Sequence, residues 1–215
     1  MAALVLLGFF GLSRWRGGEQ EAPPLGEAAQ SLLDQHVTPE GETLRIALAP
    51  TVESALLRTD LEPLRIYLER ELDRPVKWLT PPTYDDAANL LVEGDVPFAN
   101  LTAYLYVKNK TLHPELELIA VKEHAESSGS EGVMVVIADG LLKKAEDLRG
   151  MRFCFTNESS ATGYLLPRAF IREAGMNPDE DLGRQRMSGN HIEVLRDLDA
   201  GLCDVGCTFM DIYAR

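Results

Sequence analysis

The sequence predicts an α/β fold made of two similar lobes, each built around a mostly parallel sheet. From residue 43 onward, short apolar runs alternate with segments of helical periodicity, and the links between them are short. Such alternation is typical of parallel sheets with helices on both faces. The chain has 215 residues, of which 45% are hydrophobic and 26% charged, enough for one domain or two small lobes.

The first lobe is predicted to span residues 43–122. Its four strands are expected at 44–49, 75–79, 96–100 and 116–121. Its three helices are expected at 61–72, 85–93 and 103–110. Leucines spaced along the first of these helices form one apolar face. Gly94 follows the second helix at the position where glycine commonly ends a helix.

The second lobe is predicted to span residues 123–215, after a polar link at 122–132. Its strands are expected at 132–138, 152–155, 184–187 and 203–208, and its longer helices at 160–174 and 191–200. Residues 91–99 and 198–206 share one order of features, namely a helix end, a glycine and an apolar strand. This short repetition favours two similar lobes with a cleft between them.

One stretch, residues 152–163, is expected to form a strand, a turn and a helix start. Ser160, or Ser159 before it, is placed to act as the N-cap of the helix. The first N–H groups of a helix lack intrahelical partners and carry the positive end of its dipole, so hydroxyls there can cradle an anion. Two interpretations stay open: an anion site, or hydroxyls that merely cap a helix.

The acidic composition disfavours some partners but not a small anion. The formal net charge is −13, from 21 basic and 34 acidic residues. Binding of nucleic acid requires a basic face, so we expect no nucleic-acid partner. A small anion at a helix start interacts mainly with local dipoles, because distant surface charge is screened within roughly 8–10 Å.

The three cysteines predict neither a zinc site nor a disulfide. Cys154, Cys203 and Cys207 form no C-x-x-C pair, and we expect no metal or cofactor. Cys203 and Cys207 lie at opposite ends of one predicted strand, too far apart along it for their side chains to meet. Three buried free thiols are therefore expected.

The N-terminal 42 residues are expected to lie outside the folded lobes. Residues 1–16 begin with an apolar run that is too short to span a bilayer unaided, and two arginines follow it. This segment is either an export signal or the remaining end of a membrane anchor. Residues 17–42 are rich in Gly, Glu, Pro and Gln, which is typical of a linker.

Four motifs together resemble the phosphate, phosphite and phosphonate substrate-binding proteins of ABC transporters. Residues 146–153 are similar to the family's D-L-[KR]-G-x-x-F, and residues 160–167 to its S-T-S-G-x-x-x-P. Residues 188–191 resemble its G-x-H, and residues 201–204 its G-x-x-D. The resemblance covers about residues 44–208. It implies the two-lobed, type II periplasmic-binding-protein fold with a ligand between the lobes.

The resemblance also implies a set of ligand-binding residues in both lobes. They are Ser159, Ser160, Thr162, Gly163 and His191 in the second lobe, with Tyr84 and Tyr104 in the first. The chain departs from the family pattern at Ala161, which replaces the middle hydroxyl, and at Pro97, which stands where the first-lobe acid would be. Ser159 is a candidate for the missing hydroxyl.

Each aromatic or imidazole member of this set also has an ordinary structural alternative. His191 at a helix start is also placed to cap or pack. Tyr84 follows a Pro-Pro turn and is also readable as a half-buried aromatic residue, whereas the helical spacing around Tyr104 suits a core position.

Two hypotheses about function follow, and neither is an enzyme. The first is an extracytoplasmic solute-binding protein that delivers a phosphonate, phosphite or phosphate to an ABC permease. The alternative is a sensory ligand-binding module of a membrane-anchored signalling protein. The sequence has no nucleotide-binding, hydrolase or metalloprotease motif, and nothing at a recognisable spacing orients Ser160 and His191 as nucleophile and base.

The chain is further expected to be a shortened copy of its fold. In the family that it resembles, the backbone crosses back from the second lobe and adds helices to the first. Here the sequence ends at Arg215, just after the strand that would precede the crossover. An exposed apolar patch on the first lobe is therefore expected, because helices that would cover its sheet are missing.

Overall fold

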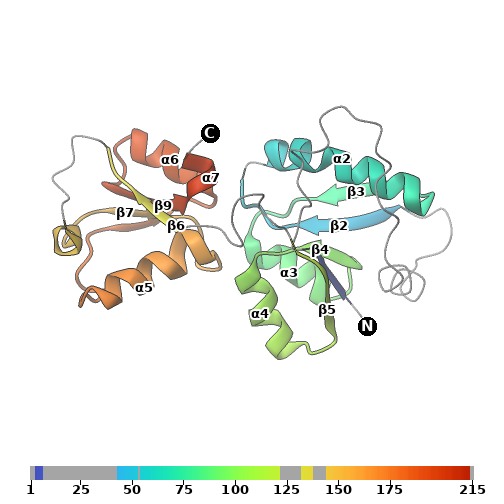
Figure 1. Ribbon diagram of the computed structural model, residues 1–215, viewed down its shortest axis with the longest axis horizontal. Coiled ribbons are helices and arrows are strands. Elements are labelled where there is room, and N and C mark those ends of the chain that lie inside the picture. Colours follow the sequence, from blue (N-terminus) through green and yellow to red (C-terminus); the bar gives the residue numbers. More distant parts are fainter. Residues whose placement is uncertain (1–2, 7–42, 53, 122–131, 138–143, 214–215) are drawn as a thin grey trace. The chain divides into compact units, whose positions relative to one another are not determined.

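The computed structural model describes residues 3–6, 43–52, 54–121, 132–137 and 144–213. Its contacts divide the chain into two compact units, each with its own sheet (Figure 1). Unit 1 comprises Met1–Pro50 and Ser54–Gly129, and unit 2 comprises Thr51–Glu53 and Ser130–Arg215. Most of the predicted polar link, residues 122–131, lies outside the described residues.

Unit 1 contains a five-stranded sheet in which every described strand pair is parallel. The strand order is β3-β2-β4-β1-β5. The strands are β1 (Ala3–Leu6), β2 (Leu44–Leu48), β3 (Val76–Leu79), β4 (Phe98–Asn100) and β5 (Leu116–Ala120). Four of these five match strands that the alternating pattern predicts.

Helices cover both faces of this sheet. The helices are α2 (Ser54–Leu72), α3 (Tyr84–Val92) and α4 (Ala103–Leu112). Leucines of α2 pack with Ile46 and Trp78 on one face. The buried side chains of α3 and α4 pack with Ala47 and Ala99 on the other. The α/β fold class that the sequence predicts is thus confirmed for this unit.

Helix α2 begins earlier than the sequence predicts, at Ser54 rather than at residue 61. The prediction began at Leu61 because residues 58–60 are exposed and polar. Pro63 therefore lies inside the helix rather than near its start. Leu57, before the exposed residues, packs with the same core as Leu61, so the apolar face continues across the polar residues that ended the prediction.

Strand β1 lies within residues 1–16, which we expected to be an export signal or anchor remnant, and that expectation stays a prediction. Ala3–Leu6 pair in parallel with both β4 and β5. A short apolar run has the same composition in a buried strand as in a signal sequence, so periodicity alone does not separate them. The rest of the N-terminal segment and the linker lie outside the described residues. In the described part of the chain, no helix is both long and apolar enough to cross a membrane.

The exposed apolar patch expected on the first lobe stays a prediction. Unit 1 does expose several large apolar side chains: Ile66, Val107, Leu112, Leu118 and Val121. Most of these lie on α4, on β5 or directly after β5.

Unit 2 contains a four-stranded sheet in the order β6-β9-β7-β8. The strands are β6 (Gly132–Val135), β7 (Phe153–Phe155), β8 (Gln185–Met187) and β9 (Val205–Phe209). The pairs β7–β8 and β7–β9 are parallel, and β6 runs antiparallel to β9 at the edge. The sheet is mostly parallel, as predicted.

Helices lie on both faces of this second sheet too. They are η2 (Ala145–Leu148), η3 (Ala161–Leu165), α5 (Leu166–Glu173), α6 (His191–Asp199) and α7 (Met210–Tyr213). Ile171 of α5 packs with Phe153 and Phe155 on one face of the sheet. Val194 and Leu198 of α6 pack with Cys154 on the other. Gly175 and Gly201 have φ values of 77° and 69° just after α5 and α6, where glycines were expected to end the helices.

A disulfide joins Cys154 to Cys203, which overturns the prediction of three free thiols. The sequence argument compared only cysteines close in the chain, whereas these two are 49 residues apart. Parallel pairing of β7 with β9 sets Cys154 opposite Gly206 and brings the segment before β9 alongside, with a Cα–Cα distance of 5.7 Å between the cysteines. That distance suits a disulfide. Cys207 is free and buried, as predicted.

Candidate functional site

The turn between β7 and η3 is built by one asparagine. The Oδ1 atom of Asn157 accepts a hydrogen bond from the N–H of Ser159 (2.8 Å), and its backbone oxygen accepts one from the N–H of Ser160 (2.9 Å). Asparagine favours such turns because its side chain imitates a backbone acceptor. The chain therefore reverses within a few residues, directly after the carboxyl end of β7.

Ser160 is the N-cap of the helix that follows, as the sequence predicts. Its Oγ atom accepts a hydrogen bond from the N–H of Gly163 (3.1 Å), and both Ser159 and Ser160 are buried. The ordinary capping interpretation is therefore correct for Ser160. The anion-binding interpretation is compatible with it, because a serine hydroxyl that accepts one hydrogen bond can still donate its own.

The first turn of the helix is wider than an α-helical turn. The N–H of Leu165 bonds to the carbonyl oxygen of Ser160 (3.0 Å), five residues back, and this π-type start continues directly into α5. Ala161 and Thr162 have no preceding helical carbonyl for their N–H groups. Those groups point out of the helix start, where the helix dipole favours negative charge. The side chain of Thr162 is half-buried at the same place.

Thr156, the residue between β7 and this turn, was not among the predicted site residues. Its side chain is completely buried, and its Oγ1 atom has no hydrogen-bond partner among the residues that the structure describes. A Cβ atom added to Gly163 would lie 2.1 Å from that Oγ1 atom. Gly163 is therefore required because the threonine hydroxyl occupies the space of its missing side chain. No motif in the sequence pointed to this pair.

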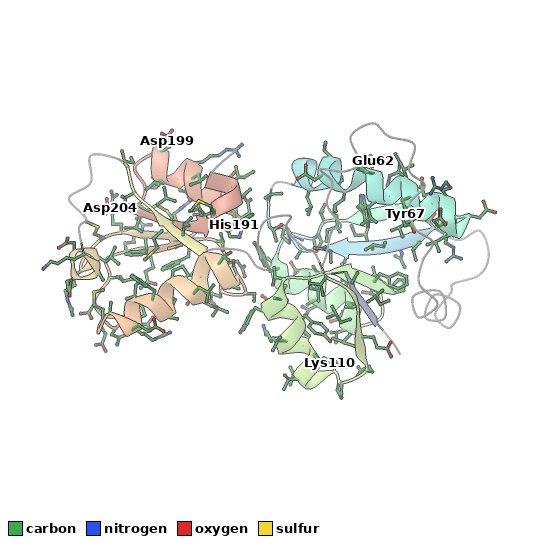
Figure 2. All side chains as sticks on the ribbon, viewed as in Figure 1. Glu62, Tyr67, Lys110, His191, Asp199 and Asp204 are labelled. Atoms are coloured by element: carbon green, nitrogen blue, oxygen red, sulfur yellow. A yellow bond between two sulfur atoms is a disulfide. The ribbon has the colours of Figure 1, made fainter. Side chains whose placement is uncertain are left out.

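His191 is the first residue of a second helix start, that of α6. Asn190 caps this helix by accepting hydrogen bonds from the N–H groups of Ile192 (3.0 Å) and Glu193 (3.1 Å). The His191 Nδ1 atom lies 3.1 Å from the Thr208 hydroxyl oxygen, and its ring packs edge-on against Phe209. Burial lowers the pKa of His191 to about 4, so the ring is neutral at pH 7. Figure 2 labels it on the ribbon of unit 2.

Backbone hydrogen bonds join the two helix starts. The N–H of Ser188 bonds to the carbonyl oxygen of Phe155 (2.8 Å), and that of Gly189 to the carbonyl oxygen of Thr156 (2.8 Å). The N–H of Thr156 in turn bonds to the carbonyl oxygen of Gly163 (3.2 Å). The turn before α6 and the start of η3 are thus both anchored at the carboxyl end of β7. Ligands of α/β proteins commonly bind at such strand ends.

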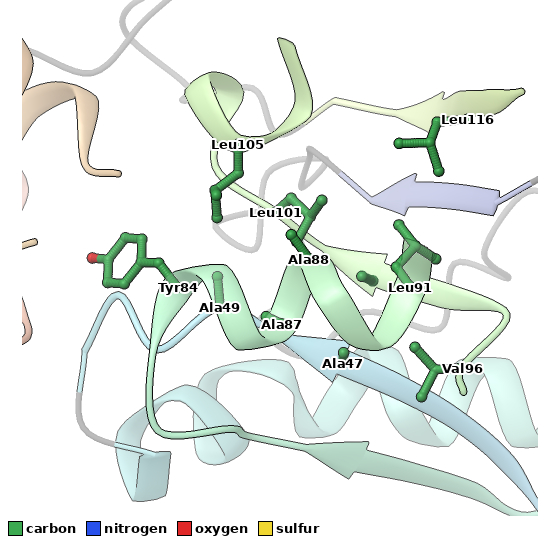
Figure 3. Close-up of a cluster of buried hydrophobic side chains, with 11 residues drawn as sticks. Ala47, Ala49, Tyr84, Ala87, Ala88, Leu91, Val96, Leu101, Leu105 and Leu116 are labelled. Carbon is green, nitrogen blue, oxygen red and sulfur yellow. The ribbon is translucent and has the colours of Figure 1, made fainter. Parts of the chain in front are cut away.

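Tyr84 and Tyr104 belong to unit 1, whereas the residues described so far belong to unit 2. Tyr84 is the first residue of α3 and is completely buried, so the half-buried alternative was wrong about its exposure. Figure 3 shows its ring at the N-terminal end of α3, extending away from Leu91 and Leu116 of the same core cluster. Tyr104 lies in the first turn of α4 and is half-buried. A site shared by these tyrosines and the residues of unit 2 stays a prediction.

The last family-like motif has a structural role. The Asp204 carboxylate accepts hydrogen bonds from the Arg152 backbone N–H (2.9 Å) and from its guanidinium Nη2 atom (2.6 Å). These hydrogen bonds lower the pKa of Asp204. The pair fixes the approach to β9 beside the start of β7. Among the described residues, no cluster of His, Cys, Asp and Glu side chains could hold a metal ion.

Comparison with known proteins gives the family. Residues 46–215 match the model of the family described as "ABC transporter, phosphonate, periplasmic substrate-binding protein". The chain belongs to this family. The match includes both helix starts described above, the sheet of unit 2, and the sheet of unit 1 apart from β1 and the first two residues of β2.

Individual relatives of the family are distant in sequence but similar in fold. The phosphate-import protein PhnD of Mycolicibacterium smegmatis is 24% identical over 186 residues, which are 81% of this chain and 58% of the relative. PhnD1 of Prochlorococcus marinus, solved in complex with methylphosphonate, is 20% identical with a TM-score of 0.69 over 80% of this chain and 65% of that one.

A third relative agrees with these two in fold and in coverage. A binding component of a phosphonate ABC transporter from Pseudomonas aeruginosa is 15% identical with a TM-score of 0.67, over 80% of this chain and 58% of that one. The chain therefore spans about three fifths of the length of these relatives. The likeness to both solved proteins confirms the predicted two-lobed, type II periplasmic-binding-protein fold.

Proposed function

We propose that this chain is the ligand-binding part of an extracytoplasmic substrate-binding protein that takes up a small oxyanion of phosphorus. The candidate ligands are a phosphonate, phosphite or phosphate, and the partner would be an ABC permease. The relatives named above are transport proteins, which favours transport over the sensory module that the sequence also allowed. The same likeness favours a protein that binds its ligand without catalysing a reaction.

The observation that carries the proposal is the helix start after β7. It combines outward-pointing N–H groups at Ala161 and Thr162 with hydroxyls at Ser159, Ser160 and Thr162. Each of these groups can donate a hydrogen bond without adding positive charge. Such a site suits an anion with several oxygens and needs no basic side chain. In the proposal, the neutral ring of His191 supplies a further N–H from the neighbouring helix start.

The disulfide supports the proposed compartment. Cys154 and Cys203 are both buried within unit 2, and the bond closes a separation of 49 residues. Structural disulfides persist in oxidising compartments such as the periplasm and are rare in the cytosol. In the full proposal, Tyr84 and Tyr104 complete the site from unit 1 when the protein closes on its ligand.

The test is isothermal titration calorimetry of the purified protein with methylphosphonate, phosphite and phosphate. Sulfate, an anion of similar shape, serves as the comparison. We expect at least one phosphorus oxyanion to bind and to raise the melting temperature, because a ligand of the native state stabilises it by mass action. Thr162→Val, which keeps the shape of the side chain but removes its hydroxyl, should weaken binding about ten- to a hundredfold.

Matched variants separate the site from general damage to the fold. Thr111→Val removes an exposed threonine hydroxyl on α4 of unit 1 and should leave the affinity unchanged. Binding of no phosphorus oxyanion by the wild-type protein would refute the proposal. Equal affinity in the wild type, Thr162→Val and Ser160→Ala would show that the ligand does not bind at this helix start.

A further inference from the structure

The buried hydroxyl of Thr156 has no assigned role, and it lies next to the candidate site. The residue is fully buried, and its Oγ1 atom occupies the space that a Cβ atom of Gly163, the third residue of the helix, would need. Buried hydroxyls in proteins nearly always have a hydrogen-bond partner, and one without a partner points to a missing water, ion or ligand. Among the described residues this hydroxyl has none.

Both backbone polar groups of Thr156 are hydrogen-bonded, so its backbone is held in place. The N–H of Thr156 bonds to the Gly163 carbonyl oxygen (3.2 Å), and its carbonyl oxygen accepts from Gly189 (2.8 Å). These two bonds fix it between the helix start that carries Ser160 and the turn that leads to His191. The two helix starts thus hold one buried hydroxyl between them, with its hydrogen-bonding capacity unused.

We propose that the Thr156 hydroxyl is a hydrogen-bond donor to the bound oxyanion, a role that rests on the function proposed above. Ala161 offers no hydroxyl at the start of this helix, so the site is short of one donor there. Thr156 supplies that donor from the strand side of the helix start. Rotation of the threonine O–H bond redirects the donor without moving the backbone.

If the hydroxyl serves the ligand, its removal should not lower the melting temperature of the ligand-free protein. A hydroxyl that serves only the ligand-bound state is a desolvated, unpaired group in the free protein, which is unfavourable. Thr156→Val replaces it by a methyl group of similar shape. The free protein should then melt at the same temperature or a few degrees higher, while the affinity for the ligand falls about ten- to a hundredfold.

The experiment compares wild type, Thr156→Val and Thr156→Ser by thermal melting without ligand and by titration with methylphosphonate. Thr156→Ser keeps the hydroxyl and should retain an affinity within about threefold of the wild type. Weaker binding by Thr156→Val, with unchanged or raised melting temperature and with rescue by Thr156→Ser, supports the proposal.

Three results would overturn it. Wild-type affinity in Thr156→Val would show that the hydroxyl does not touch the anion, although the proposed function would stand. A lower melting temperature of free Thr156→Val would show that the hydroxyl has a partner within the protein, whatever the ligand does. Failure of the wild-type protein to bind methylphosphonate, phosphite or phosphate would refute the function proposed above and this role with it.

Discussion

Loss of the disulfide should destabilise unit 2 more than the loss of any single hydrogen bond in it. Cys154 lies in β7, and Cys203 lies just before β9, at a sequence separation of 49 residues. In the chain-entropy account, a cross-link that closes a loop of this length removes enough freedom from the unfolded chain to stabilise the fold by about 4 kcal/mol. Typical domains are stable by only ~5–15 kcal/mol.

The assay is urea unfolding of the Cys154→Ala/Cys203→Ala variant, followed by the fluorescence of an environment-sensitive dye. We expect a fall of several kcal/mol in the free energy of unfolding of unit 2. Cys207→Ala serves as the control, since it removes the free thiol and leaves the cross-link intact. It should cost much less than the double variant.

Thiol counting gives the result that would refute this reasoning. The unfolded, unreduced protein should show one reactive thiol, that of Cys207, and the reduced protein three. In the native protein even that thiol should react slowly, because burial raises the pKa of Cys207 and shields its sulfur. Three thiols in the unreduced, unfolded chain from an oxidising compartment would show that the bond does not form.

Two further predictions concern the helix starts. The pKa of His191 is about 4 in the fold against an ordinary 6.5, so the unfolded state binds the proton first. The contribution of His191 to the free energy of unfolding should be fully present above pH 6.5 and should fall by up to ~3 kcal/mol as the pH drops to 4. Melting curves recorded in acid should therefore show a smaller loss of stability for His191→Asn than for the wild type. Gly163→Ala would set a Cβ atom 2.1 Å from Thr156 Oγ1, so the melting temperature of the variant should drop. The double variant Gly163→Ala/Thr156→Ala should recover part of the loss. An unchanged melting temperature of Gly163→Ala would contradict this close contact.

Much of the fold was predictable because local rules and tertiary structure agree over most of the chain. The glycines after α3, α5 and α6 have positive φ values, as residues that end helices commonly do. Ser160 caps its helix as its position suggested. These features depend on neighbours in sequence, and neighbours in sequence are what a single sequence displays.

The clearest error, the missed disulfide, involves a contact between residues distant in sequence. Cys154 and Cys203 meet only because β7 and β9 are adjacent in the sheet. The pairing of Ala3–Leu6 with β4 and β5 likewise depends on segments distant in sequence. The first turns of α2 were missed for a different reason, since the exposed polar residues 58–60 interrupt the apolar spacing between Leu57 and Leu61.

Some residues of the candidate site could likewise be recognised from their neighbours in sequence, and others only from the structure. The motif around Ser160 and Thr162 was visible because hydroxyls before a helix have a local meaning. Thr156 was not visible, because its significance depends on the approach of Gly163, seven residues later, and on the turn before His191. A buried polar group becomes informative only when its surroundings are known.

A substitution at position 161 can restore the hydroxyl that the family pattern has there. Ala161 is half-buried at the first position of η3, where its N–H points out of the helix start. Ala161→Thr places a hydroxyl beside that N–H and should strengthen binding of a phosphorus oxyanion by about tenfold, the lower value for a hydrogen bond to a charged group. Ala161→Val is the matched control, because it adds the same bulk without a donor and should give no gain. Equal affinities for the two variants would show that the ligand oxygens do not reach position 161, and that the anion is held farther along the strand ends, toward Thr156 and His191.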